Sequence, residues 1–386
     1  MKKAIVSIVL IVIIILAGYF ITREEIIEKI LLENVNIDNV ETNNMKIKNS
    51  KYYYNKLNER QKQYYARIAN GVSNLEKTII IDITKEKEHE KHKSDIAITI
   101  EYFLADHPEI FYVEEQYEIA LIDLLVVKVI NLKPNYIMNT ERRLKKVEAE
   151  MERSLNEIVN AASVPSGEYD KELRAHDILA KSVTYFNVGN QENVPNIKHT
   201  SYGALVDKSA VCDGITKAYQ IVLDKLGIES IFVTGITDEI AHAWCKVKID
   251  GEYYNVDITS SKALSKDSGD NNLIIHSYFN ITDEEIEKTH IIDDKDKLPV
   301  CNSTKYNYYI YNDYIIDYFE SFDYKLRQIV AKQSKSNILE IRAVGISNVP
   351  KNLVESLYNM NFNNYKTNDQ RKLSYSRIKD DYFVIK

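Results

Sequence analysis

The spacing of apolar residues along the chain predicts a protein built from both helices and short strands. Residues 140–162 form the clearest helix, because their apolar side chains recur at helical spacing and share one face. Runs rich in Ile, Val and aromatic residues between polar turns predict strands instead. The expected helices are 52–72, 94–106, 140–162, 170–185, 212–226, 324–335 and 351–360, and the expected strands are 78–83, 111–130, 229–236, 241–250, 252–258 and 337–344, with two more near the end.

Changes in composition divide this α+β chain into five parts. An apolar N-terminal segment is followed by an Asn-rich polar spacer, and a turn-rich break with Pro165 and Gly167 precedes the central domain. The last part is expected to be a small α+β appendage. Its Tyr-rich start favours alternating strand residues, with a carbohydrate or partner surface as the alternative. The expected boundaries are 1–22, 23–50, 51–162 (helical and α+β), 163–300 and 301–386.

The N-terminal segment indicates where in the cell the protein is located. Lys2 and Lys3 precede a charge-free run at 4–21, which as a helix would span about 27 Å, roughly one hydrocarbon core. The run is longer than the usual core of a cleaved signal peptide and lacks a good small-x-small cleavage site. We therefore expect a single-pass membrane anchor with the C-terminal part outside the cell. Secretion after signal cleavage is the alternative.

Composition narrows the class of protein further. The 386 residues are 45% hydrophobic and 28% charged, which is typical of a globular chain and not of a disordered one. A net charge of −7 argues against a nucleic-acid partner. Three cysteines and no CxxC motif argue against a disulfide scaffold, and we predict no metal and no cofactor. His89 and His92 lie in a charged run that is expected to be solvated.

Cys212 is the first candidate for chemistry. It stands at the start of an amphipathic helix that Gly227 should end. Free N–H groups and the helix dipole at that position favour the thiolate form of a cysteine, and the same N–H groups could hold an oxyanion. An inert buried cysteine is the alternative.

A predicted β-hairpin supplies the partners of this cysteine. Asp250-Gly251 between two alternating runs is a strong two-residue turn signal. In that register Trp244 lies opposite Asp257 and His242 lies opposite Thr259, so His242 and Asp257 become diagonal neighbours on one face. Cys245 points to the other face and should belong to the core.

These residues fit the arrangement of nucleophile, base and orienting group. His242 would take the proton of Cys212 and later protonate a leaving group, while Asp257 would fix the imidazole tautomer. An ordinary hairpin with a surface His and Asp is the alternative, because spacing alone does not bring Cys212 to His242.

The motifs Val-Cys-Asp-Gly ending at Gly214, His-Ala-Trp from His242 and Tyr-Tyr-Asn-Val-Asp ending at Asp257 resemble the transglutaminase-like superfamily. Segments at 105–113, 176–186 and 278–290 are similar to exported bacterial members, so the resemblance covers roughly 50–300. It implies a papain-like α+β core with catalytic Cys212, His242 and Asp257. It also implies thiolate attack on an amide carbonyl through a thioester.

The resemblance leaves two classes of function open. One is a membrane-anchored, extracellular peptidase or cross-linking enzyme acting on protein or peptide at the cell surface or wall. The other is a catalytically inactive surface module that keeps the fold. Tyr202, Asp213 and Trp244 are the candidate residues of the substrate pocket, and packing in the core is the alternative for Tyr202 and Trp244. Cys245, where many members have Asn, and the segment 258–261 depart from the family pattern.

Overall fold

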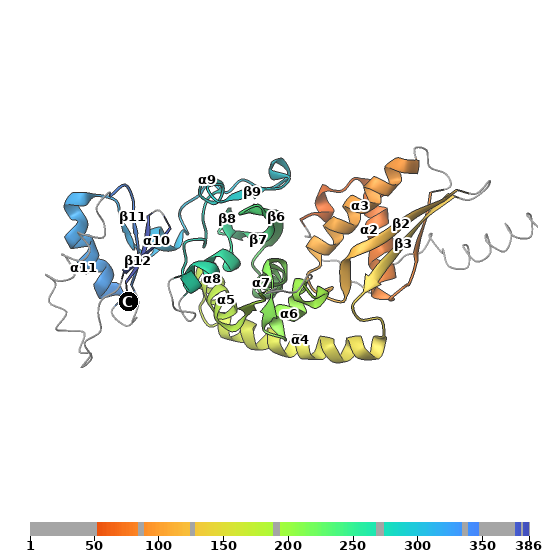
Figure 1. The fold of residues 1–386 in the computed structure, drawn as a ribbon, viewed down its shortest axis with the longest axis horizontal. Helices are drawn as coiled ribbons and strands as arrows, with labels where there is room; N and C mark the ends of the chain where they lie inside the picture. Colours follow the sequence, from red (N-terminus) through yellow and green to blue (C-terminus); the bar gives the residue numbers. More distant parts are fainter. Residues whose placement is uncertain are drawn as a thin grey trace, which may run out of the picture. The chain divides into compact units, whose positions relative to one another are not determined.

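The computed structural model of the protein describes residues 52–83, 89–123, 128–187, 194–267, 274–333, 339–346, 375–379 and 381–385. The chain divides into two compact units, Met1–Lys145 and Lys146–Lys386 (Figure 1). The expected membrane anchor, the spacer and the helix at 351–360 lie outside the described residues and stay predictions. Within the described ranges, no helix is both long enough and apolar enough to span a membrane.

The first unit is a small α+β structure. Its three-stranded antiparallel sheet has the order β1-β3-β2, and α2 and α3 pack against each other and against the sheet. Asn58 starts α2 with a capping box, in which its side chain accepts from Gln61 N and its own N–H bonds the Gln61 side chain. The expected helix at 52–72 is therefore a short 3-10 turn followed by α2. The elements are η2 (Tyr54–Lys56), α2 (Glu59–Ser73), β1 (Ile79–Asp82), α3 (His89–Asp106), β2 (Val113–Asp123) and β3 (Lys128–Tyr136).

One predicted surface feature of this unit is wrong. His92 was expected in a solvated charged run, but its ring is fully buried and its Nδ1 lies 2.7 Å from the Tyr64 hydroxyl. Four-residue spacing places Ile96 and Ile100 on the same side of α3, and both are buried. Helical spacing therefore places His92, although it lies in a charged run, on the buried face of α3.

The long helix α4 (Glu141–Ala162) matches its prediction. Its five apolar residues at helical spacing are all buried, namely Leu144, Val147, Met151, Leu155 and Ile158. Ser154 on this helix donates to the carbonyl of Leu205 in α6. The helix thereby supports the segment that leads to Cys212.

The second unit is built on an antiparallel sheet of order β8-β7-β6-β9, with α7 packed against β7 and β6 (Figure 1). Ile249 pairs with Glu252 and Cys245 pairs with Val256, which confirms the predicted register. Asp250 and Gly251 both have positive φ angles, as a type I′ turn requires. The first elements of this unit are α5 (Glu168–Ser182), β4 (Thr184–Tyr185), η3 (Asn196–His199), α6 (Ser201–Leu205), β5 (Ser209–Ala210), α7 (Cys212–Leu226), β6 (Ser230–Thr237), β7 (Ile240–Ile249) and β8 (Glu252–Val256).

The hairpin ends earlier than predicted. β8 stops at Val256, and α8 (Ile258–Asp267) follows at once, so Thr259 does not pair with His242. The reason is a helix cap, because the Asp257 Oδ1 atom accepts the N–H of Ser260 at 3.0 Å. The strand signal of the preceding residues is overridden by this cap.

Two further predictions need correction. The expected helix at 170–185 ends at Ser182, and Thr184–Tyr185 instead forms β4, which pairs in parallel with β5. The Tyr-rich stretch is not an alternating strand, because Asn307 caps a short helix, α10 (Tyr308–Tyr311), and only Ile315–Ile316 forms a strand, β10.

The C-terminal part of the second unit has its own sheet, of order β10-β11-β13-β12. A buried cluster that includes Phe322, Leu326, Ile341 and Phe383 packs α11 onto it. The remaining elements are α9 (Asp283–Ile286), β9 (His290–Ile292), η4 (Lys295–Lys297), η5 (Phe319–Ser321), α11 (Phe322–Lys332), β11 (Leu339–Ala343), β12 (Tyr375–Lys379) and β13 (Tyr382–Ile385).

Candidate active site

Cys212 is the first residue of α7 and is half-buried. The residue before it, Val211, has extended backbone angles, and no side chain caps the helix. Asp213 Oδ1 accepts the N–H of Gly214 at 2.8 Å, so the first-turn N–H groups that could face the space beside the thiol are those of Cys212 and Asp213.

The start of α7 is held by the segment before it. Val211 donates its N–H to the carbonyl of Lys198 at 3.1 Å. A Cβ atom on Gly214 would lie 2.5 Å from the same carbonyl oxygen, so only glycine allows this close approach. The Cys-x-Gly pattern thus has a structural cause: the glycine lets the chain cross over the helix that carries the thiol.

His242 and Asp257 come together as predicted. His242 Nε2 donates to Asp257 Oδ2 at 2.9 Å, and the two side chains are 7% and 1% exposed. The side chain of Cys212 lies close enough to His242 to raise the pKa of its imidazole. The structure therefore brings together the three residues proposed from the sequence as catalytic, with a hydrogen bond between His242 and Asp257.

The charges of the site favour a protonated His242. Burial alone would lower its pKa, but the Asp257 carboxylate and the Cys212 side chain raise it to about 10. Burial likewise opposes ionisation of Asp257, yet His242 and His290 hold the pKa of that carboxyl well below its usual range. The site is therefore suited to holding His242 as an imidazolium beside the Asp257 carboxylate.

His290 is a residue of the site that the sequence analysis missed. It lies on β9, which pairs with β6, and its Nε2 donates to Asp257 Oδ2 at 3.1 Å. Its Nδ1 lies 2.8 Å from Thr289 Oγ1. The only signal was its place at the end of the 278–290 segment, because nothing in local spacing predicts that β9 joins the sheet beside β6.

The three expected pocket residues are placed differently from one another. Trp244 is 1% exposed and donates its indole N–H to Asn255, so it packs behind His242 instead of lining an open pocket. Asp213 accepts from His199 Nδ1 at 2.8 Å and thereby fixes the segment that crosses α7. Tyr202 directs its hydroxyl toward Glu150 on α4, at 3.5 Å.

Tyr185 is a second missed residue. It pairs with Ala210, two residues before Cys212, and its side chain is 45% exposed. Partial burial, followed by the charges of Cys212, Asp213 and Asp257, raises its pKa to about 12. The Tyr185 hydroxyl is therefore expected to stay protonated. The sequence analysis had assigned it to the end of a helix.

The elements around these three residues form a papain-like α+β core, in which the helix bearing Cys212 packs on the antiparallel sheet bearing His242. Residues 155–258 match the family model of the transglutaminase-like superfamily. The chain therefore contains a transglutaminase-like domain, and that domain includes Cys212, His242 and Asp257. No curated protein matches the chain.

Several solved structures are similar to the chain at a low level. A protein named TGase is 17% identical, covering 37% of this chain and 44% of its own, with a TM-score of 0.27. A Cytophaga hutchinsonii protein provisionally assigned as a cysteine protease is 13% identical, covering 37% and 62%, with a TM-score of 0.24. A Parabacteroides distasonis protein provisionally assigned as a protease is 12% identical, covering 38% and 40%, with a TM-score of 0.21. The chain spans less than two thirds of each of these proteins, and no argument rests on them.

Proposed function

We propose that the protein is a cysteine acyl-transfer enzyme that attacks amide bonds of protein or peptide substrates. The observation that carries the proposal is the position of Cys212 beside His242, whose imidazole is hydrogen-bonded to Asp257. An acyl-transfer site needs a nucleophile, a base within reach and a group that orients the base, and each is present. The match to the transglutaminase-like superfamily supports the same chemistry.

The proposed reaction starts with Cys212 as a thiolate and His242 as an imidazolium. The Cys212 thiolate attacks the amide carbonyl carbon and forms a C–S bond, and the carbonyl oxygen becomes an oxyanion beside the first-turn N–H groups of α7. The His242 imidazolium gives its proton to the amide nitrogen as the C–N bond breaks. A thioester on Cys212 and a free amine result. Asp257 keeps the imidazole oriented throughout.

The acceptor decides the product of the second half-reaction. Neutral His242 would remove a proton from water or from an amine as either attacks the thioester. The C–S bond then breaks, and the thiolate and the imidazolium are restored. Water gives a peptidase, and an amine gives a cross-linking enzyme. The apolar N-terminal segment supports action at the outer face of a membrane, on substrates of the cell surface or wall.

The test uses the full-length chain in detergent micelles, a mixed peptide library and a biotin-labelled primary amine. Mass spectrometry should find either new peptide termini or peptides that carry the amine. Cys212→Ala should abolish both products. Cys245→Ala is the matched control, because Cys245 is buried against the carbonyl of Thr216 and should not affect turnover. Products that persist in Cys212→Ala, or no product with any library member, would overturn the proposal.

A further inference from the structure

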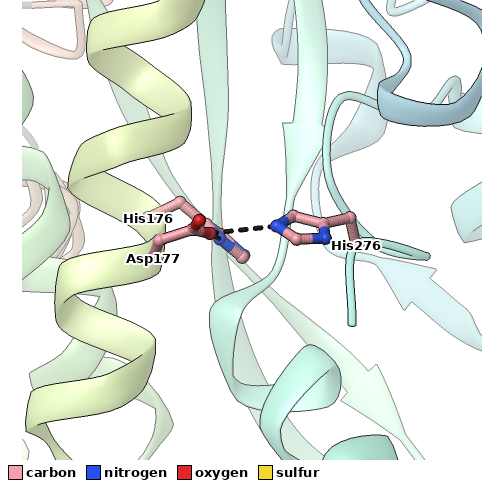
Figure 2. Close-up of side chains that lie close together, drawn as sticks. All are labelled: His176, Asp177 and His276. Carbon is pink, nitrogen blue, oxygen red and sulfur yellow. Dashed lines mark hydrogen bonds and ion pairs between the residues drawn. The ribbon is translucent and has the colours of Figure 1, made fainter. Parts of the chain in front are cut away.

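A second cluster of ligand-type side chains lies outside the triad. His176 and Asp177 stand on α5, and His276 faces them from the loop that precedes the 278–281 segment (Figure 2). Each residue of this His176 cluster (His176, Asp177 and His276) offers one ligand atom, and these atoms lie within 4.8 Å of one another. The proposed reaction does not use any of them.

The distances within the His176 cluster suit a small metal ion. Asp177 Oδ1 lies 3.0 Å from His176 Nδ1 and 3.0 Å from His276 Nε2. Bonds of about 2.0 Å in a tetrahedral zinc site place neighbouring ligand atoms about 3.3 Å apart. If Asp177 Oδ1 moved a few tenths of an ångström away from each histidine nitrogen, the three atoms would have the separations of ligands in a tetrahedral zinc site.

The residues around the cluster resemble the support that metal-binding histidines have in proteins. His276 Nδ1 donates to Glu340 Oε1 at 2.9 Å, and Glu340 also accepts from the Tyr309 hydroxyl at 2.9 Å. A histidine that ligates through one nitrogen commonly donates its other N–H to a carboxylate. Tyr308 stacks on the His276 ring at 3.9 Å and fixes its plane.

Burial and access are also consistent with a bound ion. The His176 side chain is fully buried, and its Nδ1 is the nitrogen that faces the cluster. The Asp177 side chain is 31% exposed, so water can reach the cluster and supply a fourth ligand.

We propose that His176, Asp177 and His276 bind one Zn²⁺ ion. Two imidazoles and one carboxylate favour zinc over Mg²⁺ or Ca²⁺, which prefer oxygen ligands throughout. Through Glu340 of β11, the ion braces the C-terminal sheet on helix α5 of the transglutaminase-like domain. The site is structural and does not depend on the proposed acyl-transfer activity.

The experiment uses the full-length chain in detergent, freed of metal with a chelator and then titrated with Zn²⁺ against a competing dye. We expect one tightly bound Zn²⁺ per chain and no competition by Mg²⁺. A hundredfold excess of Zn²⁺ over its Kd should raise the Tm by about 5 °C or more. Asp177→Asn should remove both effects. Glu109→Gln is the control, since Glu109 is paired with His107 outside the cluster and should retain both.

A second group of side chains could also bind zinc, so the experiment must distinguish it from the His176 cluster. His242, Asp257 and His290 also offer three atoms within 4.8 Å. His290→Asn should leave the zinc stoichiometry unchanged. The proposal is overturned if the chain binds no zinc, if Asp177→Asn binds as much as the parent, or if the bound ion disappears only in His290→Asn.

Discussion

Replacing Asp257 by asparagine should release the proton that His242 holds. The Asp257 side chain is the nearest negative charge to the imidazole, at 2.9 Å, and it is almost completely buried. Asparagine keeps the shape and can still accept one hydrogen bond, but it carries no charge. The substitution therefore removes the main interaction that offsets the free-energy cost of burying a charged His242.

The magnitude follows from the pKa of His242. A value of about 10, against an ordinary 6.5, corresponds to ~5 kcal/mol in favour of the imidazolium, at about 1.4 kcal/mol for each pH unit. Because burial then opposes the charged form with only Cys212 left to raise the pKa, His242 in Asp257→Asn should lose its proton at a much lower pH than in the parent. The sign is fixed: removal of an interaction that raises a pKa moves the titration to lower pH.

The assay is NMR of chains labelled with ¹⁵N-histidine, with His242 assigned by its loss in His242→Ala. In the parent the His242 signal should stay in the imidazolium position beyond pH 9. Asp213→Asn is the control, because Asp213 pairs with His199 and should not move the His242 titration. The reasoning is refuted if Asp257→Asn and the parent titrate at the same pH, or if the parent titrates near 6.5.

Three other substitutions test the surroundings of the site. Lys246→Met removes a buried ammonium from Asp283 at 2.9 Å and should cost about 3–5 kcal/mol in denaturant unfolding, against less than about 1 for exposed Lys248→Met. Gly214→Ala should slow Cys212 alkylation and lower the Tm, whereas Gly167→Ala should change neither. Burial raises the pKa of Glu172 to about 8 from 4.5, so the folded state holds a proton that the unfolded chain releases. The free energy of unfolding should therefore fall as the pH rises from about 4.5 to 8. Glu172→Gln should abolish that fall. Equal effects in each matched pair, or an unchanged pH dependence in Glu172→Gln, would contradict these expectations.

The hairpin shows how far local sequence can specify this site. Asp250-Gly251 fixes a two-residue turn, and strand alternation then fixes which residues share a face with His242. The pattern did not show where the second strand ends, because Asp257 has two roles. Its Oδ2 atom accepts from His242, and its Oδ1 atom caps α8.

The contacts that were missed are those made between distant segments. His290 reaches Asp257 only because β9 adds to the sheet beside β6, and that pairing has no signature within either segment. Tyr185 was assigned to a helix because Val183 ends α5 without a turn residue, and its pairing with Ala210 is long-range. The His176 cluster likewise joins residues about 100 positions apart. Local periodicity carries no information about such encounters.

The central claim is that Cys212 and His242 act as one assembled pair. The most direct measurement is the rate at which iodoacetamide alkylates Cys212 at pH 6 in the full-length chain, with peptide mass spectrometry to identify the modified cysteine. The account predicts rapid alkylation of Cys212 in the parent and a rate at least about tenfold slower in His242→Ala, because a neighbouring imidazolium sustains the thiolate at low pH. Equal rates in the two proteins would contradict it.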